Sequence, residues 1–208
     1  MKKRLFALFL AFSMAFTLAG CSSEPAQKTT LSQEGLAPYA LSEREKYILK
    51  SFNMESTSQI ISFNAPQEAI TLTVNIYRLV DDSWSRIGGG GCSLGQERAT
   101  SEKLEGAFTM QLQENYTINF NINTRVLAIF KPTEEIFLDN QIMSSLKGFL
   151  PEFREIVLNE EIPVALMVYN SANSLKFYTL QDYFEPEKLQ GMDLVQAVTL
   201  KFSDKGFE

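Results

Sequence analysis

The feature that most constrains this 208-residue chain is the alternation of apolar and polar side chains along many short runs. In the clearest case, residues 108–112 and 116–122 alternate on either side of a polar turn at 113–115. Successive side chains of a strand point to opposite faces, so each run presents one apolar face and one polar face. We expect a β-hairpin here, and its apolar face must be buried against a second layer.

The same periodicity predicts strands through most of the chain after residue 59. A hairpin is expected over 70–87, and the nearly continuous apolar run at 162–169 indicates a strand that is covered on both faces. Further strands are expected at 60–63, 126–130, 175–179 and 194–202. About eight or nine short strands separated by turn clusters predict a mainly β fold, a two-layer antiparallel β-sandwich of which the jelly roll is one form.

One or two short helices should accompany the strands. Ser42 and Glu45 have the spacing of a capping box, which predicts a helix over 42–52. Its apolar edge consists of Tyr47, Ile48, Leu49 and Phe52. We expect this edge to pack on the domain, the alternative being a helix that binds a partner. Near-helical spacing of apolar residues within 133–153, ended by Pro151, predicts a second helix, while 180–191 should be a loop or one helical turn.

A run of four glycines, Gly88 to Gly91, should interrupt the return strand of the 70–87 hairpin as a bulge or flexible loop. A phosphate cradle is the other reading of such a run. It would need a strand entering and a helix leaving, and the glycines match neither GxxxxGK[ST] nor GxGxxG.

The N-terminal segment has the layout of a secretory signal, with three basic residues at 2–4 followed by an apolar run at 5–18. Its end, Leu18-Ala19-Gly20-Cys21, resembles the lipobox of bacterial lipoproteins. The resemblance implies that Cys21 receives a diacylglycerol thioether and becomes the mature N-terminus, which places the protein on the outward face of a bacterial cell membrane. An ordinary secretory signal with an incidental Cys21 is the alternative.

This interpretation divides the chain into three parts. Residues 1–20 would be the signal peptide, 21–40 a flexible tether of small and polar residues, and 41–208 a single β-sandwich domain. No shift in composition marks a second domain.

The charge and the missing residue types exclude several functions. Removing residues 1–20 leaves 16 of the 19 basic side chains against 25 acidic ones, a formal charge of −9, which argues against nucleic-acid binding. The chain has no His, so His-dependent triads and His-ligated metals are excluded. No DxDxDG spacing indicates calcium, although Ca²⁺ would suit acidic loops, and we expect neither a metal nor a cofactor.

Candidate functional side chains are few. Trp84, the single Trp, stands beside a turn where a flat ring could bind a sugar or a partner, and Tyr77 could line the same sheet, although a Trp that begins a strand is more often a packing residue. Cys92 should be a packed thiol because lipidation would use Cys21 and leave it without a partner. Paired carboxylates occur at Asp81-Asp82, Glu134-Glu135, Glu160-Glu161, and Glu185 with Glu187.

These observations predict a membrane-anchored envelope lipoprotein whose domain is a non-catalytic binding or protein-interaction module, with an envelope protein or glycan as its partner. An envelope glycan hydrolase that uses paired carboxylates is the alternative. A purely structural or assembly role is the third possibility.

Overall fold

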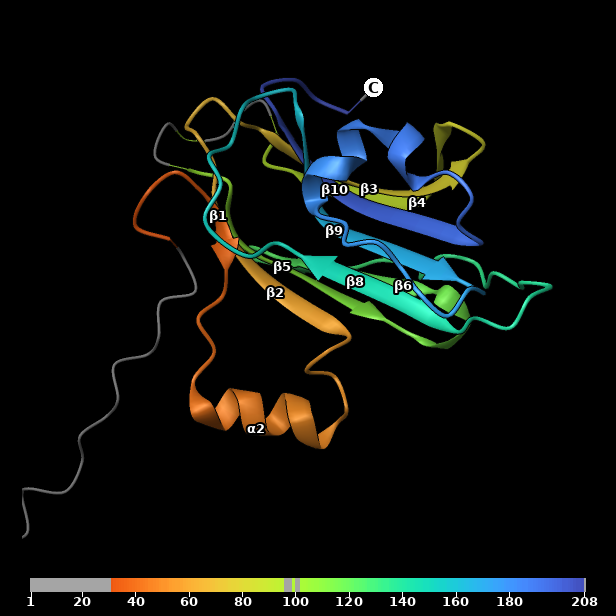
Figure 1. Cartoon of the computed structure of the whole chain (residues 1–208). Coiled ribbons are helices and arrows are strands. Elements are labelled where there is room, and N and C mark those ends of the chain that lie inside the picture. The colour runs from red at the N-terminus through yellow and green to blue at the C-terminus, as the bar shows by residue number, and fades with distance from the viewer. Residues whose placement is uncertain (1–30, 96–98, 100–101, 208) are drawn as a thin grey trace, which may run out of the picture.

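A computed structural model describes residues 31–95, 99 and 102–207. In this part of the chain, ten strands form two antiparallel five-stranded sheets that face each other as a β-sandwich (Figure 1). Sheet A has the order β1 (Gly35–Pro38), β2 (Ser58–Asn64), β5 (Glu105–Leu112), β6 (Ile118–Asn123), β7 (Leu127–Ile129). Sheet B has the order β4 (Ser83–Ser93), β3 (Thr71–Val80), β10 (Leu194–Ser203), β9 (Glu161–Asn170), β8 (Ser144–Phe149). The predicted mainly β, two-layer antiparallel sandwich is confirmed.

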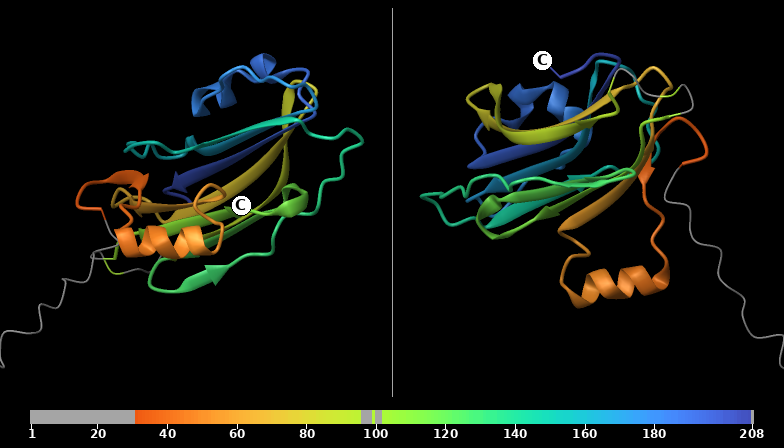
Figure 2. Two further views of the ribbon diagram at one scale, coloured as in Figure 1. Left: turned by 60° about the horizontal axis from the view of Figure 1, so that its bottom comes forward. Right: turned by 180° about the vertical axis from the view of Figure 1, so that it is seen from behind.

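One helix and three short 3-10 turns complete the described elements. They are α2 (Glu43–Ser51), η1 (Glu114–Tyr116), η2 (Leu180–Phe184) and η3 (Pro186–Leu189). In the views of Figure 2, η2 and η3 lie over sheet B, whereas α2 extends from the other side of the sandwich, beside sheet A.

The core lies between the sheets and follows from the alternation. In the 108–122 hairpin, Phe108 pairs with Ile122 and Met110 with Phe120, and all four side chains are buried. The rings of Phe63 in sheet A and Phe202 in sheet B meet across the layers with centroids 5.6 Å apart. Burial of such large apolar side chains supplies most of the stabilisation in a domain without a disulfide.

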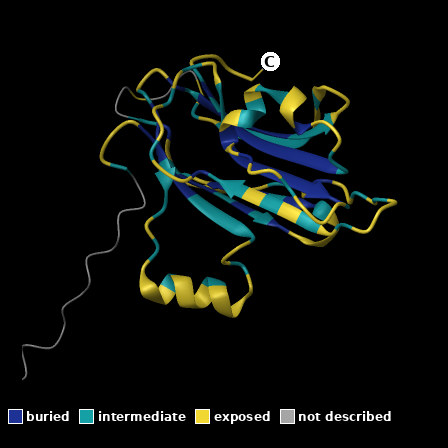
Figure 3. Cartoon of the chain, in the orientation of Figure 1, coloured by how far each residue is buried: buried dark blue, intermediate teal, exposed yellow. Residues whose placement is uncertain are grey.

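The predicted helix at 42–52 forms as α2, and its capping box is present. Glu45 N donates to Ser42 Oγ at 3.3 Å, and Ser42 N donates to Glu45 Oε2 at 2.7 Å. The prediction that its apolar edge packs on the domain is wrong, since no residue of α2 is buried. Figure 3 shows the helix mostly exposed and apart from the sandwich. Leu49 is the one residue of α2 that lines the groove against sheet A, whereas Tyr47, Ile48 and Phe52 are exposed.

The glycine run does not interrupt its strand, because residues 88–91 lie inside β4 and pair with β3. The prediction of a loop failed because close packing, rather than flexibility, requires glycine here. A methyl group at Gly88 would lie 2.9 Å from Thr133 Cγ2, and one at Gly90 would collide with the ring of Phe130. A bulge does occur in β4 directly before the run, because Ile76 pairs with Gly88 and Tyr77 with Arg86, which leaves Ile87 as the extra residue.

Three further expectations differ from the structure. The helix predicted within 133–153 is wrong, because this segment crosses from sheet A to sheet B in extended form and ends in β8, which pairs with β9. The strand predicted at 175–179 is wrong too, because this segment pairs with no strand and leads into η2. The ordered domain begins before residue 41, because β1 pairs with β2 and Leu36 is fully buried.

Candidate functional site

The outer face of sheet B is divided into an apolar half and a polar half. In the apolar half, β9 and β10 pair Val168 with Val195 and Leu166 with Ala197, and the segment containing η2 and η3 covers these side chains. In the polar half, Lys201 of β10 lies between Thr73 of β3 and Glu161 of β9. The candidate site lies where the two halves meet.

Glu161 is the centre of this site. Its Oε1 accepts hydrogen bonds from Asn75 Nδ2 at 2.8 Å and from the Tyr77 hydroxyl at 2.7 Å. Its Oε2 accepts from the Tyr183 hydroxyl at 2.9 Å and from Thr199 Oγ1 at 2.7 Å. Both oxygens are therefore engaged by β3, β10 and η2, so this carboxylate fastens the covering segment to the sheet.

An aromatic cluster stands beside the carboxylate. The rings of Trp84 and Tyr183 stack with centroids 5.1 Å apart, and Tyr77 lies 6.4 Å from Trp84 and 6.2 Å from Tyr183. Trp84 Nε1 donates to the Tyr183 carbonyl oxygen at 2.9 Å. The structure thus brings together the two predicted site residues, Trp84 and Tyr77. Trp84 is only partly exposed, and its ring stacks on Tyr183. This is the packing role that the sequence offered as the alternative to ligand binding.

Burial keeps the two tyrosines of the cluster neutral. It raises the pKa of Tyr77 and of Tyr183 well above the ordinary value, and the hydrogen bond that each donates to Glu161 raises it further. Both hydroxyls therefore remain proton donors to the carboxylate throughout the physiological range.

A polar groove of about 440 Å³ opens next to Glu161 on the same face. Three cationic side chains line it, Arg86 of β4, Lys201 of β10 and Lys205 beyond β10, whereas Glu161 is the one carboxylate among the described residues that line it. Within the described chain, none of the three cations forms an ion pair. The groove therefore concentrates positive charge on a domain whose overall charge is negative.

The guanidinium of Arg86 lies against its own strand, β4. A methyl group at Gly89 would come within 2.7 Å of Arg86 Nη2, so the guanidinium lies across the strand backbone where only glycine leaves room. Arg86 is the cross-strand partner of Tyr77, and its charge opposes the rise in the pKa of Tyr77. The glycine run thus has a role in the site, although not as a phosphate cradle.

Sequence reasoning did not select Glu161, Tyr183 or Arg86. Glu161 was considered only as one of the paired acids, and its neighbour Glu160 is exposed. Tyr183 belongs to a segment with no periodic pattern. A usable signal was the position of Glu161 at the start of a nearly continuous apolar strand, where a charged side chain needs partners.

The other candidate groups are simple to place. Burial raises the pKa of the Cys92 thiol to about 11, so it is a protonated packing residue. The pairs Asp81-Asp82 and Glu134-Glu135 are exposed. Glu155 and Glu161 both line a small pocket of about 150 Å³. The described residues contain no group of three or more His, Cys, Asp or Glu side chains that could hold a metal ion.

Cys21 and the signal segment lie outside the described residues. Among the helices that the structure describes, none has the length and apolar character needed to cross a bilayer. Comparison of the chain with protein-family models, with curated proteins and with solved structures finds no match. The class defined by the fold is a β-sandwich domain with a cationic groove on one outer face.

Proposed function

We propose that this protein is a lipid-anchored, outward-facing bacterial envelope protein whose β-sandwich is a non-catalytic binding module, and that the groove beside Glu161 binds an anionic group of an envelope glycan or protein. The observation that carries this proposal is the convergence of Arg86, Lys201 and Lys205 on one groove without an ion pair among the described residues. Cations without a partner in a partly enclosed groove are suited to carboxylate or phosphate.

The four hydrogen bonds to Glu161 favour binding over hydrolysis. A general acid or base must exchange a proton with its substrate, but each oxygen of Glu161 already accepts two hydrogen bonds from protein donors. The carboxylate instead fixes the wall of the groove. Glycan hydrolysis remains the alternative because Glu155 shares a small pocket with Glu161.

The membrane anchor rests on the lipobox-like motif. Replacing Cys21 with Ala should abolish lipid labelling and release the protein from the membrane or leave it unprocessed. Lipid labelling that continues in this variant would disprove the anchor without affecting the groove.

The groove is tested by thermal unfolding of the protein with inorganic phosphate, acetate, phosphodiester cell-wall polymers and carboxylate-bearing oligosaccharides. A ligand at about 100 times its Kd stabilises the fold by about 2.7 kcal/mol, which raises Tm by about 5–10 °C for a domain of this size. Comparison of the phosphate and carboxylate ligands identifies which anion is bound, and released sugar products would favour the hydrolase.

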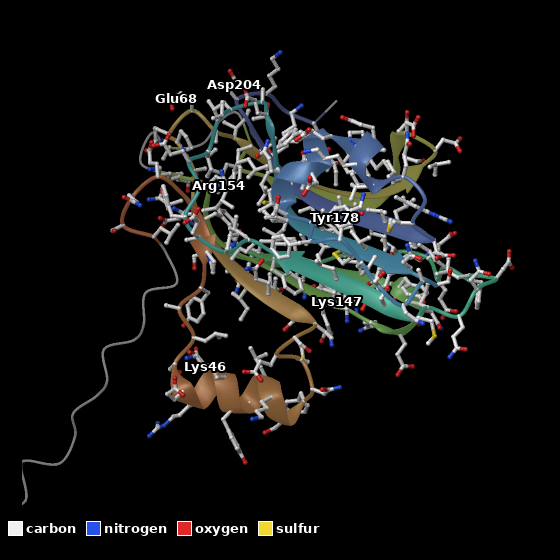
Figure 4. The ribbon with its side chains drawn as sticks, in the orientation of Figure 1. Lys46, Glu68, Lys147, Arg154, Tyr178 and Asp204 are labelled. Atoms are coloured by element: carbon white, nitrogen blue, oxygen red, sulfur yellow. The ribbon has the colours of Figure 1, made fainter. Side chains whose placement is uncertain are left out.

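The matched variants are Lys201→Ala and Lys147→Ala. Lys147 is an exposed cation on β8, outside the groove (Figure 4). Loss of Lys201 should weaken binding about tenfold because one charge-assisted contact is removed, and Lys147→Ala should bind like the wild type. Equal binding by both variants, or no shift of Tm with any ligand, would refute the groove as the site.

A further inference from the structure

Helix α2 presents large apolar side chains to solvent. Tyr47 is 73% exposed, Ile48 53% and Phe52, which directly follows the helix, 72%. Ile48 and Phe52 are four residues apart, so they share one face. Figures 1 and 3 show that this helix extends away from the sandwich.

The helix is nevertheless formed and oriented. Its capping box fixes the first turn, and the Tyr39 hydroxyl donates to Glu45 Oε1 at 3.1 Å. Leu49 faces a groove of about 460 Å³ against sheet A, which it lines together with Met54. Ile48 does not line that groove. The exposed apolar side chains are thus held away from the domain by an ordered helix.

The domain does not cover these side chains in the structure. The groove under α2 is lined by polar side chains of sheet A, such as Asn121, and by apolar ones, such as Ile60, but Leu49 is the one residue of α2 that lines it. The three exposed apolar side chains lie outside this groove. A surface that covers them therefore comes from outside the domain.

The length of the chain before the domain limits what that occupant can be. Nine residues lie between Cys21 and Leu31, the first described residue, and the ten steps along the chain from Cys21 to Leu31 can span at most about 35 Å. Asn64 Nδ2 donates to the Leu31 carbonyl oxygen, which fixes this point beside β2, and α2 follows β1 in the sequence. With Cys21 lipidated, as proposed above, the Asn64 end of β2 lies within about 35 Å of the bilayer, and α2, which leads into the other end of β2, can reach the same surface.

The composition of α2 fits the surface of a membrane. Of its acidic residues, Glu43 pairs with Lys46 at 2.8 Å and Glu45 belongs to the capping box. Arg44 and Lys50 form no ion pair among the described residues and are available to lipid phosphates. Aromatic and aliphatic side chains with flanking cations are typical of helices that lie in the headgroup region.

We propose that α2 is an interfacial helix that inserts Ile48, Phe52 and Tyr47 into the bilayer that holds the Cys21 lipid. This inference rests on the proposed anchor. It has a consequence for orientation, because α2 extends from the sheet A side whereas the cationic groove lies on the opposite outer face, on sheet B (Figure 2). Sheet A therefore faces the membrane, and the groove faces outward toward its partner.

The test uses the full processed, lipidated protein in vesicles of phosphatidylethanolamine and phosphatidylglycerol, with or without bromine on the acyl chains near the headgroups. Bromine quenches tryptophan only at short range. Phe52→Trp places a reporter on α2, and Phe184→Trp places a matched one on η2 at a site that is 54% exposed. In the wild-type protein, the tryptophan fluorescence comes from Trp84, the single Trp.

We expect the added emission of Phe52→Trp to shift to the blue and to fall by at least about half with brominated lipid, as for a ring about 5–10 Å below the surface. Wild type and Phe184→Trp should not change. An unquenched Phe52→Trp in vesicles that carry the protein overturns the interfacial helix alone, as does equal quenching of Phe184→Trp. A shift that depends on protein concentration and not on bromine would assign the helix to a second copy.

Co-sedimentation of the Cys21→Ala variant separates the two proposals. Binding of the wild type and release of Cys21→Ala supports the anchor whatever α2 does. Failure of the wild type to sediment with vesicles overturns both proposals.

Discussion

The outer faces of the two sheets differ in how far other segments of the chain cover them. The face of sheet B is half covered by the segment that carries η2 and η3, whose Leu180 and Leu189 are buried there. The face of sheet A has no such cover, and the one helix beside it contributes no buried residue.

The strands themselves explain this difference. The central strands of sheet B, β9 and β10, are apolar on both faces along much of their length, so leaving the outer face bare would expose Leu166, Val168 and Val195. In sheet A, β5 and β6 alternate, and their outer side chains, such as Gln111 and Asn119, are polar and can remain in water. The comparison places the candidate site on the outer face of sheet B. The outer face of sheet A, which no segment covers in this way, is the face that we propose lies toward the membrane.

The largest loss of stability should come from a substitution at Gly89, in the strand β4 beside the groove. Gly89 has φ +142°, and a methyl group there would also collide with the Val74 carbonyl oxygen. We expect Gly89→Ala to lower the free energy of unfolding by at least about 3 kcal/mol, because strain and steric overlap add.

The matched control is Gly206→Ala, where a methyl group meets no atom within 4 Å. Denaturant unfolding of both variants measures the difference. A Gly89→Ala protein as stable as Gly206→Ala would show that β4 does not pack as described.

The next effect should come from releasing the cover of sheet B. Glu161→Ala leaves the Tyr77 and Tyr183 hydroxyls and the Asn75 amide without their acceptor. We expect a loss of about 2–3 kcal/mol, which lowers Tm by about 5–10 °C. Trp84 fluorescence should change as well because its stacking partner is freed.

Glu160→Ala is the neighbouring control, since this residue is exposed and has no role in the network. Its unfolding free energy should stay within about 0.5 kcal/mol of the wild type. If both variants lose the same stability, the carboxylate does not fasten the cover.

Alkaline pH should weaken sheet B through its tyrosines. Burial, and then the hydrogen bond to Glu161, raises the pKa of Tyr77 above the ordinary value of 10.0, and burial raises that of Tyr169 to about 12. A raised folded-state pKa gives stability that is complete below the unfolded value and is lost as pH rises through the folded one. Unfolding free energy should therefore fall from about pH 10 upward.

Urea unfolding of the wild type and of Tyr77→Phe between about pH 8 and pH 11.5 measures this loss. The variant should show a shallower decline because one of the titrating hydroxyls is gone. Parallel curves for the two proteins would contradict the assignment to Tyr77.

The smallest effect should come from α2. Phe52→Ser and Ile48→Ser should change the free energy of unfolding by less than about 0.5 kcal/mol, because these exposed side chains pack on nothing in the domain. Phe108→Ser, on the buried face of sheet A, should cost about 3–5 kcal/mol in the same assay. A large loss at Phe52 would mean that α2 packs on the sandwich.

Much of the architecture could be read from local pattern. The alternation at 108–122 predicted its hairpin, the spacing of Ser42 and Glu45 predicted α2 with its cap, and the apolar run at 162–169 predicted a covered strand. These features depend on neighbours within a few residues, so a short window contains the information that decides them.

Where local pattern failed, a distant contact decided the outcome. The apolar residues of 133–153 fit helical spacing, but pairing of β8 with β9 gave an extended chain instead. The glycines of β4 were expected to form a bulge or a flexible loop, yet they stay paired in the strand, packed against Phe130 and Thr133, and the bulge falls just before them.

The sequence by itself determined that the chain is a mainly β sandwich with a short capped helix. It also identified Trp84 and Tyr77 as candidate binding residues. Only the tertiary structure decided that both belong to a cluster with Tyr183 around Glu161. These groups come from β3, β4, β9 and η2, which are far apart in the sequence. Strand order and register bring them together, and both depend on how whole sheets bury their apolar faces rather than on any local run of residues.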